Sequence, residues 1–204
     1  MGLIEKLKTQ GVLKTPQIID AFRSINRRAF LPPELADLAE VDEALPIGHG
    51  QTISQPTVVA FMLEQLQPRE GDKILDIGAG SGWTSALLAS IVGKKGKVVA
   101  IDIVPEVAEF GIQNLAAYNF LSKGIVKYVC QDGSKGYEKE APFDKILVSA
   151  ALGKKELPNS WKEQLSIGGK IVVPIGDSIW IFTKKNETEY EEVEYPGFVF
   201  VPFV

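Results

Sequence analysis

Cysteine and histidine are almost absent from this chain, which has one of each among 204 residues. With Cys130 as the only cysteine, no disulfide can form within the chain. Cys130 ends the strand-like run "VKYVC", so we expect it to be buried as a small apolar residue.

Positive charge is also scarce, because 22 Lys and Arg stand against 26 Asp and Glu, for a net charge of −4. No run of Lys or Arg is longer than two residues, which disfavours a nucleic-acid-binding surface built on bulk positive charge. No apolar run approaches the ~20 residues that span a bilayer, and the charged N-terminus does not resemble a signal peptide. These absences predict a cytoplasmic protein without nucleic-acid or membrane partners.

Apolar residues make up 45% of the chain and charged residues 24%, as in an ordinary globular protein, and the length suits one domain. In the first part of the chain, apolar residues recur at helical spacing and predict an N-terminal helical extension over residues 1–47: Leu3, Ile4, Leu7, Ile18, Ile19, Phe22 and Ile25. The core is expected over residues 57–204.

Short runs rich in Val and Ile alternate with helical stretches in that core: "KILDIG", "VVAID", "VKYVC", "KILVSA" and "KIVVPIG". This pattern predicts an α/β fold, with a Rossmann-like, doubly wound, mostly parallel sheet of seven strands. At the end, "SIWIFTKK" and "FVFVPFV" flank the polar run "NETEYEEVE" without a helix between them. We expect these two runs to pair as antiparallel strands, with the charged run as a solvated hairpin.

The turn "KILDIGAGSGW" joins the first strand of this sheet to the next helix. Its glycines at 78, 80 and 82 let the backbone approach a ligand at a helix N-terminus. A dinucleotide-binding turn would have glycine where Trp83 stands, and a P-loop would have lysine after Gly82. Asp76 would repel a pyrophosphate but suits a cationic ligand, and S-adenosylmethionine fits that description.

Two more acids support this interpretation. Asp102 ends the second strand, twenty residues after Gly82, where a carboxylate can accept from both ribose hydroxyls. Asp132 follows the third strand and could accept from the adenine amino group. Ligands of open α/β sheets bind at the carboxyl ends of the strands, so three acids at three successive strand ends indicate one site.

The stretch "GHGQTISQP", residues 48–56, is rich in hydroxyl and amide groups and carries no formal charge. Together with the glycine turn, it resembles the protein-L-isoaspartate O-methyltransferases, and the resemblance covers nearly the full length. It also includes "GVLKTPQIIDAF", "GKVVAID", "QDGSKGY", "APFDKILVSAA", "GGKIVVPIG" and "VFVPF". The "GQTISQP" block is the most specific part, because all class I methyltransferases share the glycine turn.

The resemblance implies a monomeric enzyme that uses S-adenosyl-L-methionine to esterify the free α-carboxylate of L-isoaspartyl residues in damaged proteins and peptides. It also implies release of S-adenosyl-L-homocysteine, and repair through a succinimide that reopens partly to normal aspartate. Ser54 matches the family's active-site serine and Thr52 is its neighbour, and both are expected to contact substrate together with the backbone near Val201. The expected cofactor contacts are Gln51, Thr52, Ile53, Ser54, Asp76, Gly78, Gly80, Asp102, Asp132 and Gly133.

A neutral loop suits this reaction. A carboxylate with a pKa near ~4 is ionised at neutral pH, so it needs no general base, and we assign none to His49. Hydroxyl and amide donors can orient its oxygen, and the rate would come from positioning in a site that excludes water. We expect Trp83 to pack at the start of its helix and Asn114 to lie at the surface.

Some positions depart from the family pattern. Thr57 stands where many members have histidine or tyrosine, and Val59 stands where some have histidine. The segment "SAALGKKELP" lacks the usual proline and has two added lysines. This segment, within residues 149–158, follows the fourth strand beside the expected donor site, so the change bears on substrate range more than on cofactor binding.

Three alternatives stay open. The first is a related carboxyl methyltransferase dedicated to one peptide, which the altered segment 149–158 allows. The second is a non-catalytic cofactor-binding module, which the presence of Thr52 and Ser54 disfavours. The third is a nucleotide-dependent oxidoreductase, which the glycine spacing and Trp83 disfavour.

Overall fold

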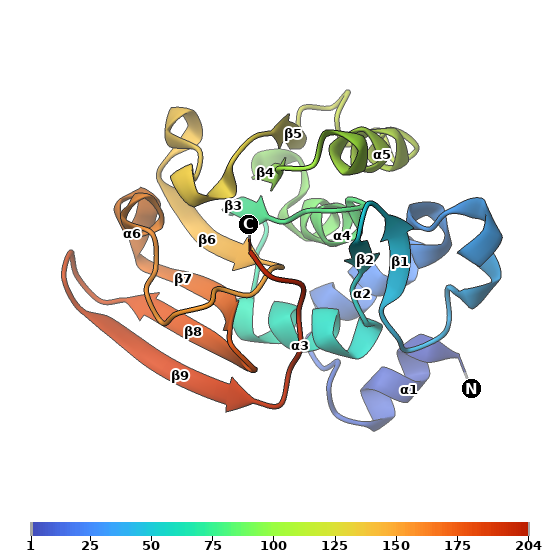
Figure 1. The fold of residues 1–204 in the computed structure, drawn as a ribbon, viewed down its shortest axis with the longest axis horizontal. Coiled ribbons are helices and arrows are strands. Elements are labelled where there is room, and N and C mark those ends of the chain that lie inside the picture. The colour runs from blue at the N-terminus through green and yellow to red at the C-terminus, as the bar shows by residue number, and fades with distance from the viewer. Residues whose placement is uncertain (1, 204) are drawn as a thin grey trace.

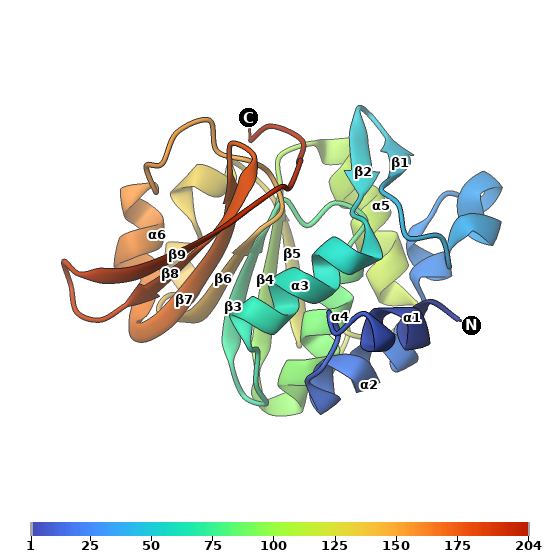
Figure 2. The same cartoon turned by 90° about the horizontal axis from the view of Figure 1, so that it is seen from below.

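The computed structural model describes residues 2–203, which form a seven-stranded sheet with helices on both faces (Figures 1 and 2). The spatial order is β5-β4-β3-β6-β7-β8-β9. The first five of these strands are parallel, and β8 runs antiparallel to both of its neighbours. The strands are β3 (Lys73–Ile77), β4 (Lys97–Asp102), β5 (Val126–Cys130), β6 (Phe143–Val148), β7 (Leu165–Ile175), β8 (Ser178–Lys184) and β9 (Tyr190–Pro196).

The helices form layers around this sheet. On one face lie α3 (Pro56–Leu66), α4 (Trp83–Val92) and α5 (Pro105–Ala116), with α1 (Leu3–Thr9) and α2 (Pro16–Ser24) packed outside them. The short helix α6 (Asn159–Gln164) covers the other face. The 3-10 segments are η1 (Arg27–Phe30), η2 (Pro33–Leu38), η3 (Gly93–Lys95), η4 (Gly133–Lys135) and η5 (Glu138–Glu140). The doubly wound arrangement and the helical N-terminal segment agree with the sequence prediction.

The central strand β3 is buried on both faces of the sheet, which explains its continuous apolar sequence. Side chains of a strand alternate between the faces, so Ile74 packs in the core under α4, while Leu75 and Ile77 pack in the core under α6. Asp76 shares a face with Ile74 and therefore points toward α4. The strands on either side of β3, β4 and β6, extend the sheet in opposite directions. The switch point of the topology therefore lies at β3.

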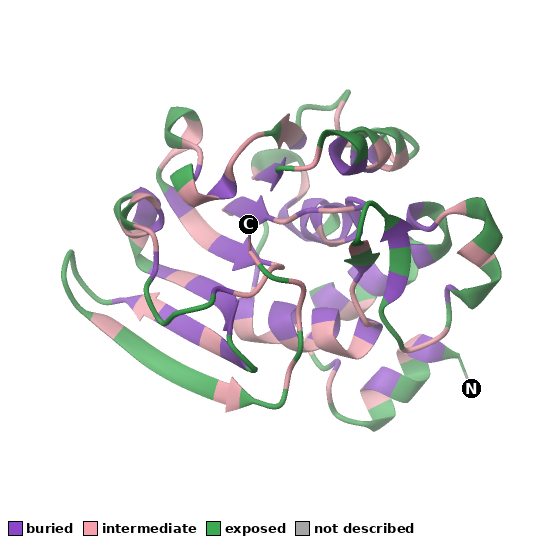
Figure 3. Cartoon of the chain, viewed as in Figure 1, coloured by how far each residue is buried: buried purple, intermediate pink, exposed green. Residues whose placement is uncertain are grey.

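Residues Tyr190–Pro196 form the last strand, which corrects the expectation that "FVFVPFV" would pair with β8. Of the charged run 186–194, the first part is therefore turn and the part from Tyr190 onward is strand. An outer strand with one neighbour leaves its side chains in solvent, so glutamates are tolerated there, and Figure 3 shows β9 exposed over most of its length. The segment after β9 instead crosses toward β6, with Phe198 stacked on Phe61 and Phe203 packed against Trp161.

Cys130 is exposed, which corrects the prediction that it would be buried. It is the final residue of β5, the strand at the other edge of the sheet, where no further strand covers it among residues 2–203. In the part of the chain that the structure describes, every helix is too short or too polar to cross a membrane.

Candidate active site

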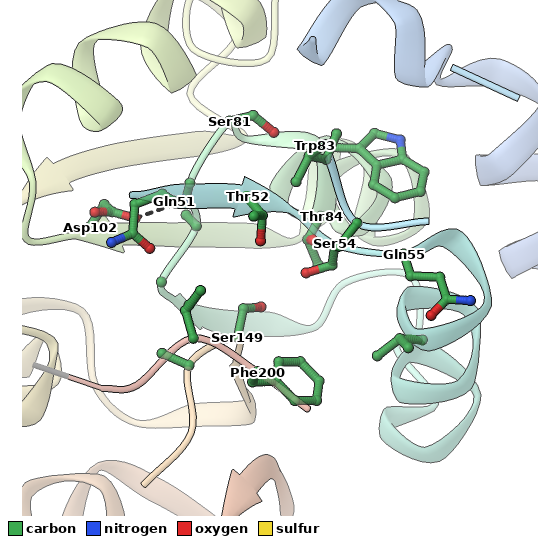
Figure 4. Close-up of a pocket in the computed structure, with 18 of the residues that line it drawn as sticks. Gln51, Thr52, Ser54, Gln55, Ser81, Trp83, Thr84, Asp102, Ser149 and Phe200 are labelled. Carbon is green, nitrogen blue, oxygen red and sulfur yellow. Dashed lines mark hydrogen bonds between the residues drawn. The ribbon is translucent and has the colours of Figure 1, made fainter. Parts of the chain in front are cut away.

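A cavity of about 320 Å³ opens at the carboxyl edge of the sheet, between the turn after β3, the segment before α3 and the chain end (Figure 4). Asp102 is its one charged lining residue within residues 2–203. The lining residues are Ala44, Gln51, Thr52, Ile53, Ser54, Gln55, Val58, Gly78, Ala79, Gly80, Ser81, Trp83, Thr84, Asp102, Ser149, Ala150, Val199, Phe200 and Val201.

One wall of the cavity is a small β-hairpin, here called the active-site hairpin (residues 45–54). Its strands β1 (Leu45–Gly48) and β2 (Gln51–Ile53) pair antiparallel, and its tip is His49-Gly50. Both tip residues have positive φ, and His49 is exposed and does not line the cavity. In Figure 4, Thr52 and Ser54 project from this hairpin into the same space, with Ser149 and Phe200 across from them. The predicted loop is therefore part of a hairpin that begins earlier in the sequence.

The opposite wall is the glycine turn (residues 78–82), which three side chains hold by its backbone. Asp102 accepts from the Gly80 N–H at 2.9 Å. The Tyr128 hydroxyl donates to the Gly80 carbonyl at 2.8 Å, and the Asn114 amide donates to the Ser81 carbonyl at 3.0 Å. Asn114 is therefore half-buried and bound to the turn, contrary to its expected surface position.

The turn also depends on close packing with α5. Gly111 of α5 lies so near that a Cβ would stand 2.6 Å from the Gly80 carbonyl oxygen, and a Cβ at Gly82 would meet Leu115 at 3.0 Å. Gly80 and Gly82 have φ of 55° and 82°, a region that favours glycine. Sequence reasoning identified the three glycines of the turn but missed Gly111, because a glycine inside a helix gives no local sign of its neighbour.

Asp102 reaches the position that its spacing predicted, at the end of β4 and facing the cavity. Its second oxygen accepts from the Val104 N–H at 3.1 Å, and the residue is buried. A carboxylate has about four lone-pair directions, so two remain for the hydroxyls of a ribose. The two backbone donors fix the carboxylate before any ligand arrives.

Asp76 lies beneath the glycine turn and is fully buried at 0% exposure, outside the cavity lining. One carboxyl oxygen accepts from the Ser85 hydroxyl at 2.6 Å, and the other has no hydrogen-bond partner. Burial raises the pKa of Asp76 to about 7, against the opposing effect of the Ser85 hydrogen bond. Its expected contact with the cofactor therefore stays a prediction, and its observed contact is with α4.

Asp132 and Gly133 follow β5, at the same edge of the sheet. Gly133 lines a second cavity of about 50 Å³, which shares Gln51, Gly78 and Asp102 with the main one. Asp132 lines neither cavity and instead accepts from the Ser134 N–H at 2.9 Å. Hydrogen bonding from Ser134, first from its side chain and then from its N–H, lowers the pKa of Asp132. The two cavities therefore lie next to each other at Asp102.

The chain end forms the third wall. The Val201 carbonyl accepts from the Ala151 N–H, and the Phe203 N–H donates to the Ala151 carbonyl, both at 2.8 Å. Val201 thus reaches the cavity as expected. Phe200 and Ser149, which sequence reasoning missed, line it as well. Ser149 comes directly after β6, so the strand-end rule that found Asp102 could have found it.

Two of the residues that depart from the family pattern, Thr57 and Lys155, make defined contacts in the structure. The Thr57 hydroxyl and N–H donate to the two carboxyl oxygens of Asp42, at 2.6 and 2.9 Å, at the start of α3. Lys155 turns toward the outer strands, where its ammonium lies 3.5 Å from the Trp180 ring centroid and 2.7 Å from a Glu192 carboxyl oxygen. Neither Lys154 nor Lys155 lines the main cavity.

The switch-point cavity, the glycine turn and the carboxylate at the end of the next strand define a class I S-adenosylmethionine-dependent methyltransferase. Comparison with known proteins gives the family. The family model "Protein-L-isoaspartate(D-aspartate) O-methyltransferase (PCMT)" matches residues 1–204, and the chain therefore belongs to this family of enzymes. The resemblance seen in the sequence is confirmed.

Individual relatives agree with this assignment. The chain is 41% identical to a protein-L-isoaspartate O-methyltransferase of Methanopyrus kandleri over 206 residues, covering 99% of this chain and 89% of the relative. It is 45% identical to protein-L-isoaspartate O-methyltransferase 2 of Archaeoglobus fulgidus, over 91% of this chain and 83% of the relative. A crystal structure from Plasmodium falciparum, a putative protein-L-isoaspartate O-methyltransferase in complex with S-adenosyl-L-homocysteine, superimposes with a TM-score of 0.88. It covers 99% of this chain and 96% of that one at 24% identity, which supports the fold.

Proposed function

We propose that this chain methylates the free α-carboxylate of L-isoaspartyl residues in damaged proteins and peptides, and that Ser54 and Thr52 orient that carboxylate. The observation that carries the proposal is the chemistry of the cavity wall. Hydroxyl and amide groups make up much of its polar lining, and Asp102 is the one carboxylate that lines it within residues 2–203; we assign the hydroxyl side to the substrate and the Asp102 side to the ribose. An anionic substrate therefore meets neutral hydrogen-bond donors, while a cationic methyl donor has a carboxylate nearby.

S-adenosyl-L-methionine supplies a methyl group on a positively charged sulfur; the new carbon–oxygen bond forms as the carbon–sulfur bond breaks and S-adenosyl-L-homocysteine leaves. Asp102 would accept from the ribose hydroxyls, and the backbone at Gly78 and Gly80 would lie against the donor. Gly133 and the small cavity would hold the adenine. Gln51 lines both cavities, so it would cover the donor from the hairpin side.

The reacting carboxylate is already ionised at neutral pH, so the chain has no proton to remove. The hydroxyls of Ser54 and Thr52 would donate to one carboxylate oxygen and leave the other free to attack the methyl group. Ile53, between them in the sequence, is mostly buried, pairs with Leu45 of β1 and also lines the cavity. In this proposal the residues of the chain accelerate the reaction by orientation and by excluding water, without a base.

A broad substrate range is part of the proposal. A peptide-dedicated enzyme would be expected to read side chains with groups placed at the cavity mouth. Here Lys155 is engaged by Trp180 and Glu192, which leaves neutral and backbone groups to meet the substrate.

We also propose that the enzyme acts as a cytoplasmic monomer without a nucleic-acid partner, for which the net charge of −4 is the support. Sedimentation of the purified protein would check the monomer.

Two peptides that differ only in L-isoaspartate or L-aspartate at one position test the proposal. We expect methyl transfer from labelled S-adenosyl-L-methionine to the isoaspartyl peptide alone. Transfer to neither peptide, with S-adenosyl-L-homocysteine binding intact, would contradict it and favour a dedicated substrate. A panel of isoaspartyl peptides with different flanking residues would then identify that substrate. Binding of the donor without even a single turnover on the whole panel would indicate a non-catalytic binding module.

A further inference from the structure

Arg27 is a buried arginine in η1 of the N-terminal segment, directly behind the residues that line the cavity, and only 4% of it is exposed. Its guanidinium donates to four backbone carbonyls. Three belong to one stretch, those of Ala39, Val41 and Glu43, at 3.3, 3.0 and 2.8 Å. The fourth is the carbonyl of Ser54, at 3.2 Å. None of its side-chain hydrogen bonds within residues 2–203 goes to a carboxylate.

The same guanidinium also touches the other wall of the site. Its central carbon lies 5.4 Å from the centroid of the Trp83 ring, within the range of a cation–π contact. Trp83 is the first residue of α4, immediately after the glycine turn, and Phe22 packs edge-on against it. In Figure 4 the Trp83 ring points away from the space between Thr52 and Ser54. Arg27 therefore contacts both walls from the side that faces away from the cavity, through Ser54 at the hairpin and through Trp83 next to the glycine turn.

We propose that Arg27 is a positioning residue for methyl transfer, which fixes the active-site hairpin relative to the glycine turn. It holds Ser54 by the main chain, so that the Ser54 side chain stays at a set distance from the methyl donor. This role rests on the proposed function of Ser54. Arg27 is expected to touch neither substrate nor donor.

The contacts of Arg27 indicate that an arginine stands at this position because it directs hydrogen bonds, and not because it fills space. A buried cation whose hydrogen bonds all go to carbonyl oxygens gains less than it would in a full ion pair, and the Nε atom of Arg27 has no hydrogen-bond partner. Burial lowers the pKa of Arg27 to about 10, with Asp42 opposing the change. A methionine would fill the same space without these costs. What arginine provides is a planar group with donors in fixed directions, which lysine lacks.

Three variants test the role. Arg27→Met should lower kcat on the isoaspartyl peptide about tenfold, because the hairpin would shift relative to the donor. S-adenosyl-L-homocysteine affinity should stay within about threefold, since the glycine turn keeps its own supports. Arg27→Lys should fall between Arg27→Met and wild type. Arg28→Met is the matched control, because Arg28 is exposed in the same η1 segment and pairs with Asp37; kcat should change less than about twofold.

A second measurement applies if Arg27→Met fails to fold. Methylguanidinium added to Arg27→Ala should restore kcat, and the same addition to Arg28→Ala should not raise it. Full kcat in folded Arg27→Met would overturn the proposal, as would an equal loss of kcat and of S-adenosyl-L-homocysteine affinity. Failure of methylguanidinium to restore a folded Arg27→Ala would also overturn it. An inactive wild type would instead overturn the proposed function itself, so the two failures can be told apart.

Discussion

The two walls of the cavity are held in different ways. The glycine turn is tied to the sheet and to α5 by Asp102, Tyr128 and Asn114, and glycine packing fixes it further. The strands of the active-site hairpin, within residues 2–203, pair with each other alone. The hairpin is otherwise held by the burial of Leu45, Ile47 and Ile53 in the core and by two polar contacts, Arg27 with the Ser54 carbonyl and Asp42 with Thr57 at the start of α3.

This difference indicates that the two walls have different functions in binding and turnover. A wall fixed by many buried contacts is ready for its ligand before binding, so it should set affinity for the methyl donor. A two-stranded wall with few hydrogen bonds to the rest of the chain can move more easily, to admit a peptide and close behind it. Changes to the glycine turn should therefore alter stability and donor affinity, and changes to the hairpin should alter turnover.

The largest effect is expected at Asp76, beneath the glycine turn. Its pKa of about 7 in the folded protein is higher than in the unfolded chain, so the native state keeps a proton that the unfolded state has lost. Wild-type stability should therefore fall as pH rises from about 4 to about 7 and level off above that, by at most roughly 4 kcal/mol.

Asp76→Asn should not show this fall, because an amide does not ionise. Urea unfolding at intervals between pH 5 and 8 measures the difference, with the exposed Asp37→Asn as control. If wild type and Asp76→Asn kept the same free-energy difference at every pH, the buried carboxyl would not be the source of the effect.

Asp102→Ala should weaken S-adenosyl-L-homocysteine binding by about 3 kcal/mol, or about 100-fold, because two ribose hydrogen bonds to a carboxylate are lost. Two backbone N–H groups, at Gly80 and Val104, also lose their acceptor. Calorimetry on the folded variant measures this, and Asp177→Ala, an exposed position in the turn after β7, is the control. Unchanged affinity would mean that the ribose lies elsewhere.

Ser54→Ala should lower kcat about 30-fold, the value of one hydrogen bond to a charged group at about 2 kcal/mol. Donor affinity should change by no more than several-fold, because the glycine turn is intact. Steady-state rates with the isoaspartyl peptide test this, and the exposed Ser122→Ala serves as control. Wild-type turnover in Ser54→Ala would show that the serine does not orient the carboxylate.

Tyr128→Phe should have the smallest effect, a loss of about fivefold in donor affinity with kcat at saturation unchanged. It removes the hydroxyl that binds the Gly80 carbonyl, worth about 1 kcal/mol, and keeps the ring that packs against Gly111. Equilibrium binding and rates at saturating donor measure the two quantities. A loss of kcat with normal affinity would break the separation between the two walls.

The sheet and the carboxyl-edge site could be predicted because they follow from local patterns. Apolar runs indicate buried strands, and an acid after such a run must lie at the ligand-binding edge, which placed Asp102 correctly. The pairing of β8 with Tyr190–Pro196 could not be predicted, because an exposed outer strand has no apolar pattern. Cys130 was misplaced because the sequence of β5 does not reveal that it is an edge strand.

The contacts that fix the site were hidden for another reason. Tyr128, Asn114 and Arg27 are 48, 33 and 27 residues away from the carbonyls that they bind. A single sequence carries no signal for such pairs, since each residue has an ordinary local role as strand, helix or surface group. Gln51, Thr52, Ile53 and Ser54 were found through the family resemblance, and their assigned roles stay predictions.

The glutamates of β9 affect how the enzyme interacts with its polypeptide substrates at the edge of the sheet. Damaged proteins present loosened chains with free backbone groups, and an exposed strand edge is a ready place for such chains to add. Glu191, Glu192 and Glu194 place charged side chains along that strand, and Glu191 and Glu192 pair with Lys185 and Lys155, so a further strand would have to disturb these ion pairs to add there. The outer strand thus disfavours the addition of a client polypeptide to the sheet as a further strand, and the client can leave once it has been methylated.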